Sequence, residues 1–136
     1  MGKTILQRLE IPNIHTKLIK DYYLIIYDLS YCKLVGIPFD IYITKIVKEY
    51  NYYKLYIDEK SINLVEQIDT YFNELIDNYT AIIKNDNHNN KYIKFNNNSS
   101  NIIGKKLSQI KHNKLAINII KIKKTTLYCC PIVYLL

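Results

Sequence analysis

Apolar residues in the middle of the chain recur at intervals of three and four, which is the period of an amphipathic helix. An oxygen of Asp58 or Ser61 can accept a hydrogen bond from the first turn, and the asparagine-rich residues 85–90 end the pattern. We therefore predict one long helix over residues 62–83. Its apolar face comprises Ile62, Val65, Ile68, Phe72, Leu75, Ile76, Tyr79 and Ile83.

The opposite face of this predicted helix is acidic and carries Glu66, Asp69, Glu74 and Asp77. Two carboxylates that act as acid and base need a cleft, and an exposed helix face does not provide one. We therefore expect these four side chains to be solvated and to have no catalytic role.

Most of the remaining chain has the composition of β-strands. Residues 22–28, 40–50, 53–58 and 91–95 are rich in β-branched and aromatic side chains. Asn51 and Tyr52 can form a tight turn, so the second and third of these segments are expected to form a hairpin that leads into the helix. In residues 91–95, Ile93 and Phe95 share one face with Lys91, while Tyr92 and Lys94 share the other.

The C-terminal part begins with a polar loop and continues with two further strands. Residues 96–104, NNNSSNIIG, are expected to be flexible. In residues 114–124 the apolar positions change face after Ile119, which predicts a bulge. Thr125 and Thr126 can turn the chain into a last strand, LYCCPIVYLL at residues 127–136, in which Pro131 indicates an edge or a bulge.

This order of elements predicts a single α+β domain over residues 1–136 that is mostly β. We expect a small curled sheet or an OB-like barrel with one long helix inserted between strands.

Charge is distributed unevenly along the chain. Residues 1–86 contain all twelve acidic and ten basic residues, a net of −2, whereas residues 87–136 contain nine lysines and no acid. Ile, Lys, Asn and Tyr have A/T-rich codons, and an A/T-rich genome would favour all four. Only the placement of lysine and tyrosine is therefore informative.

Several classes of function are not expected. No apolar run is long enough to span a bilayer, and the N-terminus has no secretion signal core, so the protein is expected to be intracellular. Cys32, Cys129 and Cys130 and the scattered histidines do not have the spacing of a metal site or a disulfide framework. Catalytic and phosphate-loop motifs are absent as well. We predict a protein that is not an enzyme and needs no cofactor.

Lysines next to tyrosines on strand faces favour binding of single-stranded nucleic acid. Basic side chains contact phosphates, and flat rings provide surfaces on which bases stack. The candidate binding residues are Lys91, Tyr92, Lys94, Lys121, Lys123, Lys124 and Tyr128. The alternative interpretation is that codon bias placed these residues on an ordinary surface.

Several segments resemble the OB-fold single-stranded-DNA-binding proteins of nucleocytoplasmic large DNA viruses and related phages. These segments are KLVGIPF at residues 33–39, then YKLYID followed by the helix, then KYIKF, KLAINIIKIKK and TLYCCPIVYLL. The resemblance covers about residues 22–136. It implies that the protein coats single strands exposed during viral DNA replication, independently of sequence, in the host cytoplasm or nucleus.

Two alternatives remain open at this point. The apolar end, Ile132 to Leu136, would make a structural or interaction protein plausible, with a homo-oligomer formed through this C-terminal edge. The basic charge would also suit an RNA-binding component. No membrane partner is expected.

Overall fold

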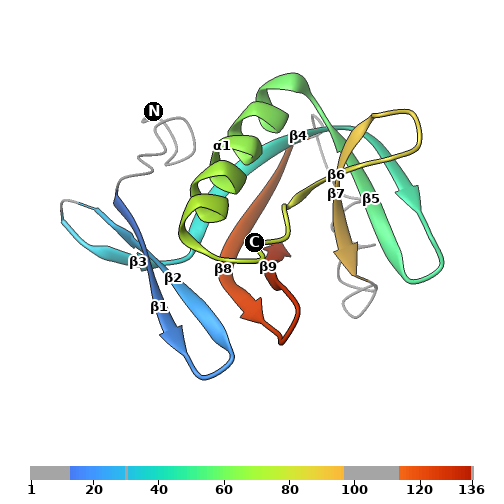
Figure 1. Cartoon of the computed structure of the whole chain (residues 1–136). Helices are drawn as coiled ribbons and strands as arrows, with labels where there is room; N and C mark the ends of the chain where they lie inside the picture. Colours follow the sequence, from blue (N-terminus) through green and yellow to red (C-terminus); the bar gives the residue numbers. More distant parts are fainter. Residues whose placement is uncertain (1–12, 30, 97–113, 136) are drawn as a thin grey trace.

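Antiparallel strands make up most of the part of the chain that the structure describes, and the one helix in that part packs on them (Figure 1). The computed structural model describes residues 13–29, 31–96 and 114–135. The strands are β1 (Ile14–Ile19), β2 (Tyr22–Asp28), β3 (Lys33–Val35), β4 (Ile37–Lys48), β5 (Tyr52–Ile57), β6 (Ile83–Asn85), β7 (Lys91–Asn96), β8 (Lys114–Lys124) and β9 (Cys129–Leu135), and the helix is α1 (Glu59–Leu75).

All nine strands belong to one curled sheet. Its main path is β1-β2-β8-β4-β5-β7-β6, with β3 paired to β2 and β9 paired to β8. The first half of β4 pairs with β8 and its second half with β5, with a register shift between Ile43 and Lys45. The mostly β, α+β class is thus confirmed, but the sheet does not close into a barrel.

The curled sheet and α1 enclose one apolar core. Its inward side chains come from every second residue of the long strands, including Phe39 and Ile41 of β4, Leu55 of β5 and Ile93 of β7. Phe72 of α1 is fully buried against them. Because one side of each strand is used for the core, the alternate residues are left on the outer side of the sheet.

The helix was predicted in the right place but with the wrong limits. Asp58 caps it, because its side chain accepts a hydrogen bond from the Ser61 N–H at 2.9 Å. It ends at Leu75 instead of residue 83, and Asn78 adopts a left-handed conformation with φ of 59°. Ile83 therefore belongs to strand β6 and not to the helix.

The strand predictions were largely confirmed. Strands β2, β5, β7, β8 and β9 lie within two residues of the predicted segments, and the register shift between Ile119 and Lys121 is the predicted bulge. Thr125 turns the chain, since its N–H and side chain both donate to the carbonyl of Tyr128. Strands β1, β3 and β6 were missed. The loop predicted over residues 96–104 lies outside the described residues apart from Asn96, which ends β7.

Asp69 is a clear correction to the sequence analysis. It was placed on the solvated face of the helix, but only 8% of the residue is exposed. Its carboxylate accepts hydrogen bonds from the Tyr79 hydroxyl and from the N–H groups of Ile82 and Ile83 at 2.7 to 3.1 Å. Burial raises the pKa of Asp69, although these donors and the charge of Lys84 oppose the shift.

These bonds secure the segment that leaves the helix. Next to them, Thr80 N–H donates to the Cys129 carbonyl and Cys129 N–H donates to the Asn78 carbonyl. The segment therefore joins the start of β9 to the start of β6 where the sheet remains open. Asp69 supplies acceptors for N–H groups that a continuous strand ladder would otherwise satisfy.

Candidate nucleic-acid interface

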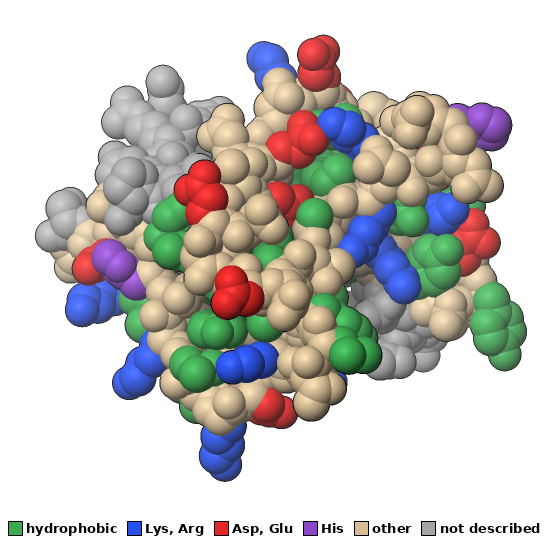
Figure 2. Space-filling model, in the orientation of Figure 1, with side chains coloured by type: hydrophobic (Ala, Val, Ile, Leu, Met, Phe, Trp, Pro, Cys, Tyr) green, Lys and Arg blue, Asp and Glu red, His purple; other side chains and the backbone are tan. Residues whose placement is uncertain are grey.

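Lysines and tyrosines alternate on the outer side of β4, β5 and β7. The register pairs Lys45 with Tyr56, and Tyr56 in turn with Tyr92. It also pairs Lys54 with Lys94. We call this surface the Lys/Tyr face; it consists of Lys45, Tyr52, Lys54, Tyr56, Tyr92 and Lys94. Figure 2 shows lysine side chains (blue) next to hydrophobic ones (green, a class that includes tyrosine) and an acidic one (red) on the right of the molecule, where β5 and β7 lie.

The rings and ammonium groups of this face contact one another closely. The Lys94 ammonium lies 4.7 Å from the centre of the Tyr52 ring, and Lys54 lies 5.2 Å from that of Tyr92. Lys45 lies 5.7 Å from the Tyr56 ring, and the Tyr56 and Tyr92 rings are 5.6 Å apart. The face is thus a connected array of cation–π pairs and not a set of separate side chains.

The face carries a positive charge in excess. Lys54 is 3.6 Å from the Glu49 carboxylate. Burial lowers the pKa of Lys54, but its electrostatic interactions with the neighbouring tyrosine side chains and with Glu49 outweigh this and raise it. Within the described residues, neither Lys45 nor Lys94 forms an ion pair. Three ammonium groups stand against the carboxylates of Glu49 and of Asp86, which accepts a hydrogen bond from Tyr56. One positive charge is left in excess, so the surface is attractive to an anion.

Of the predicted residues on β7, Tyr92 and Lys94 belong to this face and Lys91 does not. As predicted, Lys91 points to the other side of the strand, where its ammonium lies 2.7 Å from Glu66 of α1. That ion pair neutralises Lys91. Glu66, which was expected to be solvated, therefore contacts the sheet.

The second predicted group lies at the far end of β8. Lys121 and Lys123 are on the outer side, opposite Leu24 and Tyr22 of β2, and the Lys121 ammonium is 5.0 Å from the Tyr22 ring. We call Tyr22, Lys121 and Lys123 the distal patch. Lys124 is exposed and, by alternation, points to the opposite side of the strand, while Tyr128 lies in the turn between β8 and β9, 49% exposed.

The structure does not bring the two predicted groups together. Ile37 of β4 pairs with Ile119 of β8; Lys45 follows Ile37 by eight residues, and Lys121 follows Ile119 by two in the opposite direction. Each bulge adds one residue to its strand without advancing the pairing, so about eight residue steps of the ladder separate the two lysines. At about 3.3 Å per residue, Lys45 and Lys121 are about 25 to 30 Å apart along the sheet. The Lys/Tyr face and the distal patch are therefore separate clusters on the same side of the sheet.

A hollow lies beside the Lys/Tyr face, between the bulge in β4 and the turn from β6 to β7. Asp86 lines it and accepts hydrogen bonds from the Tyr56 hydroxyl and the N–H groups of His88 and Asn90 at 2.8 to 2.9 Å. The Asn90 N–H is the largest cause that lowers the pKa of Asp86. In turn, the bond to Asp86 raises the pKa of Tyr56. These bonds fix the orientation of the Tyr56 ring.

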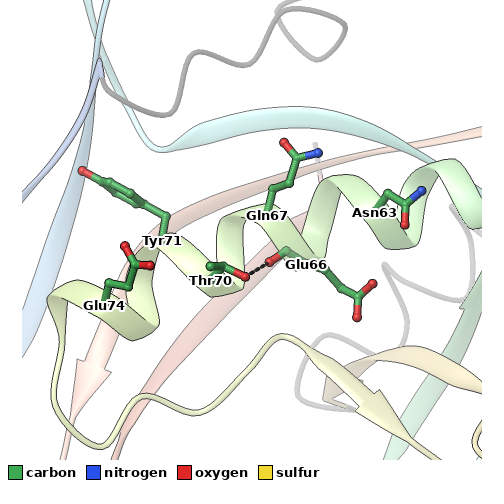
Figure 3. Close-up of a pocket in the computed structure, with 6 residues that line it drawn as sticks. All are labelled: Asn63, Glu66, Gln67, Thr70, Tyr71 and Glu74. Atoms are coloured by element: carbon green, nitrogen blue, oxygen red, sulfur yellow. Dashed lines mark hydrogen bonds between the residues drawn. The ribbon is translucent and has the colours of Figure 1, made fainter.

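A broader hollow on the outer side of α1 has the character of a solvated helix surface. All six side chains that line it come from the helix (Figure 3). Thr70 donates to the Glu66 carbonyl at 2.9 Å, and the Tyr71 hydroxyl donates to the carbonyl of Ile14 in β1. Among the described residues, the lining comes from this one element, which leaves the hollow open to solvent.

Residues 132–135 of the apolar end of the chain are paired within the fold. Strand β9 is hydrogen-bonded to β8 over its whole length, which leaves Ile132 and Val133 half-buried and Tyr134 38% exposed. Cys32, Cys129 and Cys130 are free thiols. Across the described ranges, no cluster of His, Cys, Asp or Glu is suited to a metal, and no helix is long and apolar enough to cross a membrane.

Four residues of the Lys/Tyr face were missed by the sequence analysis. Tyr52, Lys54 and Tyr56 alternate with the buried Tyr53, Leu55 and Ile57, and this period of two was visible in the sequence. Lys45 was harder to find, because the bulge after Ile43 shifts the alternation of β4. The strand that neighbours β7 could not be identified without the fold.

No protein-family model matches this chain, and no curated protein or solved structure matches it at a significant level. The resemblance to viral single-stranded-DNA-binding proteins therefore stays a prediction.

Proposed function

We propose that this protein binds single-stranded nucleic acid through the Lys/Tyr face, independently of base sequence. The observation that carries the proposal is the array of three lysines and three tyrosines on one side of adjacent strands. Such a surface offers both contacts that a single strand needs, namely cations for the phosphates and flat rings for the bases. No base-specific groups are required, so no sequence preference is expected.

Binding would exchange one set of contacts on the face for another. In the free protein, lysine ammonium groups lie over the tyrosine rings. An exposed cation–π contact is worth about 0.5 to 1 kcal/mol, whereas a base stacked on an aromatic ring contributes about 1 to 3 kcal/mol. A base can therefore displace the ammonium group favourably, and the freed lysine remains within reach of the neighbouring phosphates.

We expect DNA to be the preferred strand, although the face also suits RNA. The resemblance of the chain to viral proteins that coat single-stranded DNA supports this choice, together with a role in viral replication. The proposal requires neither catalysis nor a cofactor.

Fluorescence anisotropy with labelled oligo-dT, its duplex and the equivalent RNA, at several salt concentrations, tests the proposal. We expect the single strand to bind more tightly than the duplex, with log affinity falling against log salt by about 0.7 per neutralised phosphate. Replacing Tyr92 with alanine should weaken binding by about 1 to 3 kcal/mol, or roughly 5- to 150-fold, because a stacking surface is lost.

Matched controls separate this effect from general loss of charge or aromatic surface. Tyr31→Ala removes an exposed tyrosine outside the Lys/Tyr face, and Lys60→Ala removes an exposed lysine of α1. Both should bind oligo-dT like the unmodified protein. Failure of the unmodified protein to bind single strands at low salt would contradict the proposal, as would equal losses in Tyr31→Ala and Tyr92→Ala.

A further inference from the structure

The Lys/Tyr face and the distal patch lie on the same side of one continuous sheet. In β8, Ile119 and Ile122 point into the core on either side of the bulge, so Lys121 and Lys123 point outward. In β4 and β5, Ile43 and Leu55 point inward in the same way. A strand lying on the outer surface can therefore pass from one cluster to the other without crossing an edge of the sheet.

The surface between the clusters is neutral and partly aromatic. Tyr42 of β4 lies there opposite Lys114, and it is 45% exposed. Lys114 is paired with Asp40 at 3.2 Å, so the two charges cancel. Further along, Tyr134 of β9 lies opposite Asn118. Counted over the residues that the structure describes, the connecting surface therefore offers two exposed rings and no net negative charge that would repel phosphates.

We propose that one single strand contacts both the Lys/Tyr face and the distal patch, and runs between them over the outer side of β4 and β8. This inference rests on the proposed function, because it extends the same binding site. Its consequence is a minimum length. A stacked strand rises about 3.4 Å per nucleotide, so about eight nucleotides span the 25 to 30 Å between the clusters.

Because the two clusters are far apart, the affinity should depend on the length of the bound strand. A shorter strand reaches only one cluster, and we expect it to occupy the larger Lys/Tyr face. A longer strand that is held at this face reaches the distal patch at high effective concentration, so its affinity rises without any change in the protein. Contacts with Lys121 and Lys123 should also steepen the dependence of log affinity on log salt by about 1.4 in total.

The experiment measures dissociation constants by anisotropy for oligo-dT of about 4 and about 16 nucleotides, the two ends of the range of site sizes of single nucleic-acid-binding domains. The short strand is too short to span both clusters even when it is fully extended. The proteins are the unmodified chain, the distal double variant Tyr22→Ala with Lys121→Ala, and Lys60→Ala as a control for lost charge. Thermal unfolding followed by circular dichroism establishes that each variant is folded. A longer strand also binds more tightly because it offers the protein more positions at which to bind. The ratio of the two affinities in the distal double variant measures this statistical gain.

We expect the distal double variant to bind the long strand at least tenfold more weakly than the unmodified chain, and the short strand within twofold. Lys60→Ala should match the unmodified chain at both lengths. If the distal double variant binds both strands normally, this inference is overturned while the proposed function stands. If the unmodified chain binds neither strand, both are overturned. A folding defect in the double variant is resolved with Lys121→Glu alone, for which the same length-selective loss is expected.

Discussion

The inner and outer sides of the β5–β7–β6 part of the sheet each hold one carboxylate in a similar set of hydrogen bonds. Asp69 on the inner side and Asp86 on the outer side each accept bonds from one tyrosine hydroxyl and two backbone N–H groups. Yet the pKa of Asp69 is raised and that of Asp86 is lowered. Burial accounts for the difference, because removing a carboxylate from water outweighs the same three donors.

The comparison also separates two tasks in the molecule. On the inner side, α1 and its polar contacts hold the curled sheet in shape. On the outer side, Asp86 orients Tyr56, and the surrounding lysines and tyrosines remain accessible. Changes on the inner side should therefore cost folding stability, and changes on the outer side should cost binding.

The largest effect is expected from Phe72→Ala on the inner side. Phe72 is fully buried between α1 and the sheet, so its removal leaves a cavity and should lower the free energy of unfolding by about 3 to 5 kcal/mol. Denaturant unfolding measures this. Leu75→Ala on the same helix is the matched control, because Leu75 is 53% exposed and should cost much less. Similar losses in the two variants would contradict the assignment of the core.

A smaller loss, which depends on pH, is expected from Asp69→Asn. The asparagine amide replaces one carboxylate oxygen with an NH2 group, which faces an N–H or hydroxyl donor and cannot accept from it. This should lower the free energy of unfolding by about 1 to 3 kcal/mol. In the folded protein the pKa of Asp69 lies above its unfolded value of about 3.9. Between the unfolded pKa and the folded pKa, the folded state therefore binds more protons than the unfolded state. The contribution of Asp69 to the free energy of unfolding falls as the pH rises through this interval.

Denaturant unfolding at several pH values tests this sign. The difference in unfolding free energy between the unmodified protein and Asp69→Asn should be largest below about pH 4 and should shrink towards pH 7. A difference that grows with pH over this range would show that the carboxylate is stabilised in its ionised form.

The smallest effect on stability, with the opposite dependence on pH, is expected from Asp86→Asn. Its folded pKa lies below the unfolded value, so its contribution is fully present above about pH 4 and is lost as pH falls through the folded pKa. The same unfolding series measures it. His88→Ala keeps the backbone N–H bonded to Asp86 but removes the imidazole charge, which also lowers the pKa of Asp86, so it should reduce the pH dependence only in part. If Asp69→Asn and Asp86→Asn change with pH in the same direction, burial is not what distinguishes the two sites.

Period-two and helical patterns allowed much of the fold to be predicted from the sequence. The alternation in residues 91–95 placed Tyr92 and Lys94 on the outer side and Lys91 on the inner side, as the structure has them. The helix was overextended because Tyr79 and Ile83 continue its apolar period. Tyr79 packs on the core from a turn, and Ile83 packs on it from β6, so the apolar period alone could not show where the helix ends.

The sequence by itself determined most of the strands, the presence of the long helix, and which residues share a side in regular strands such as β5 and β7, because these properties depend on neighbours a few residues apart. Only the tertiary structure decided that β5 lies beside β7, which assembles Tyr52, Lys54, Tyr56 and Tyr92 into one face. It also decided that Lys121 lies far from them and that Asp69 is buried. These outcomes depend on strand order and on the curl of the sheet, which arise from contacts between residues distant in sequence.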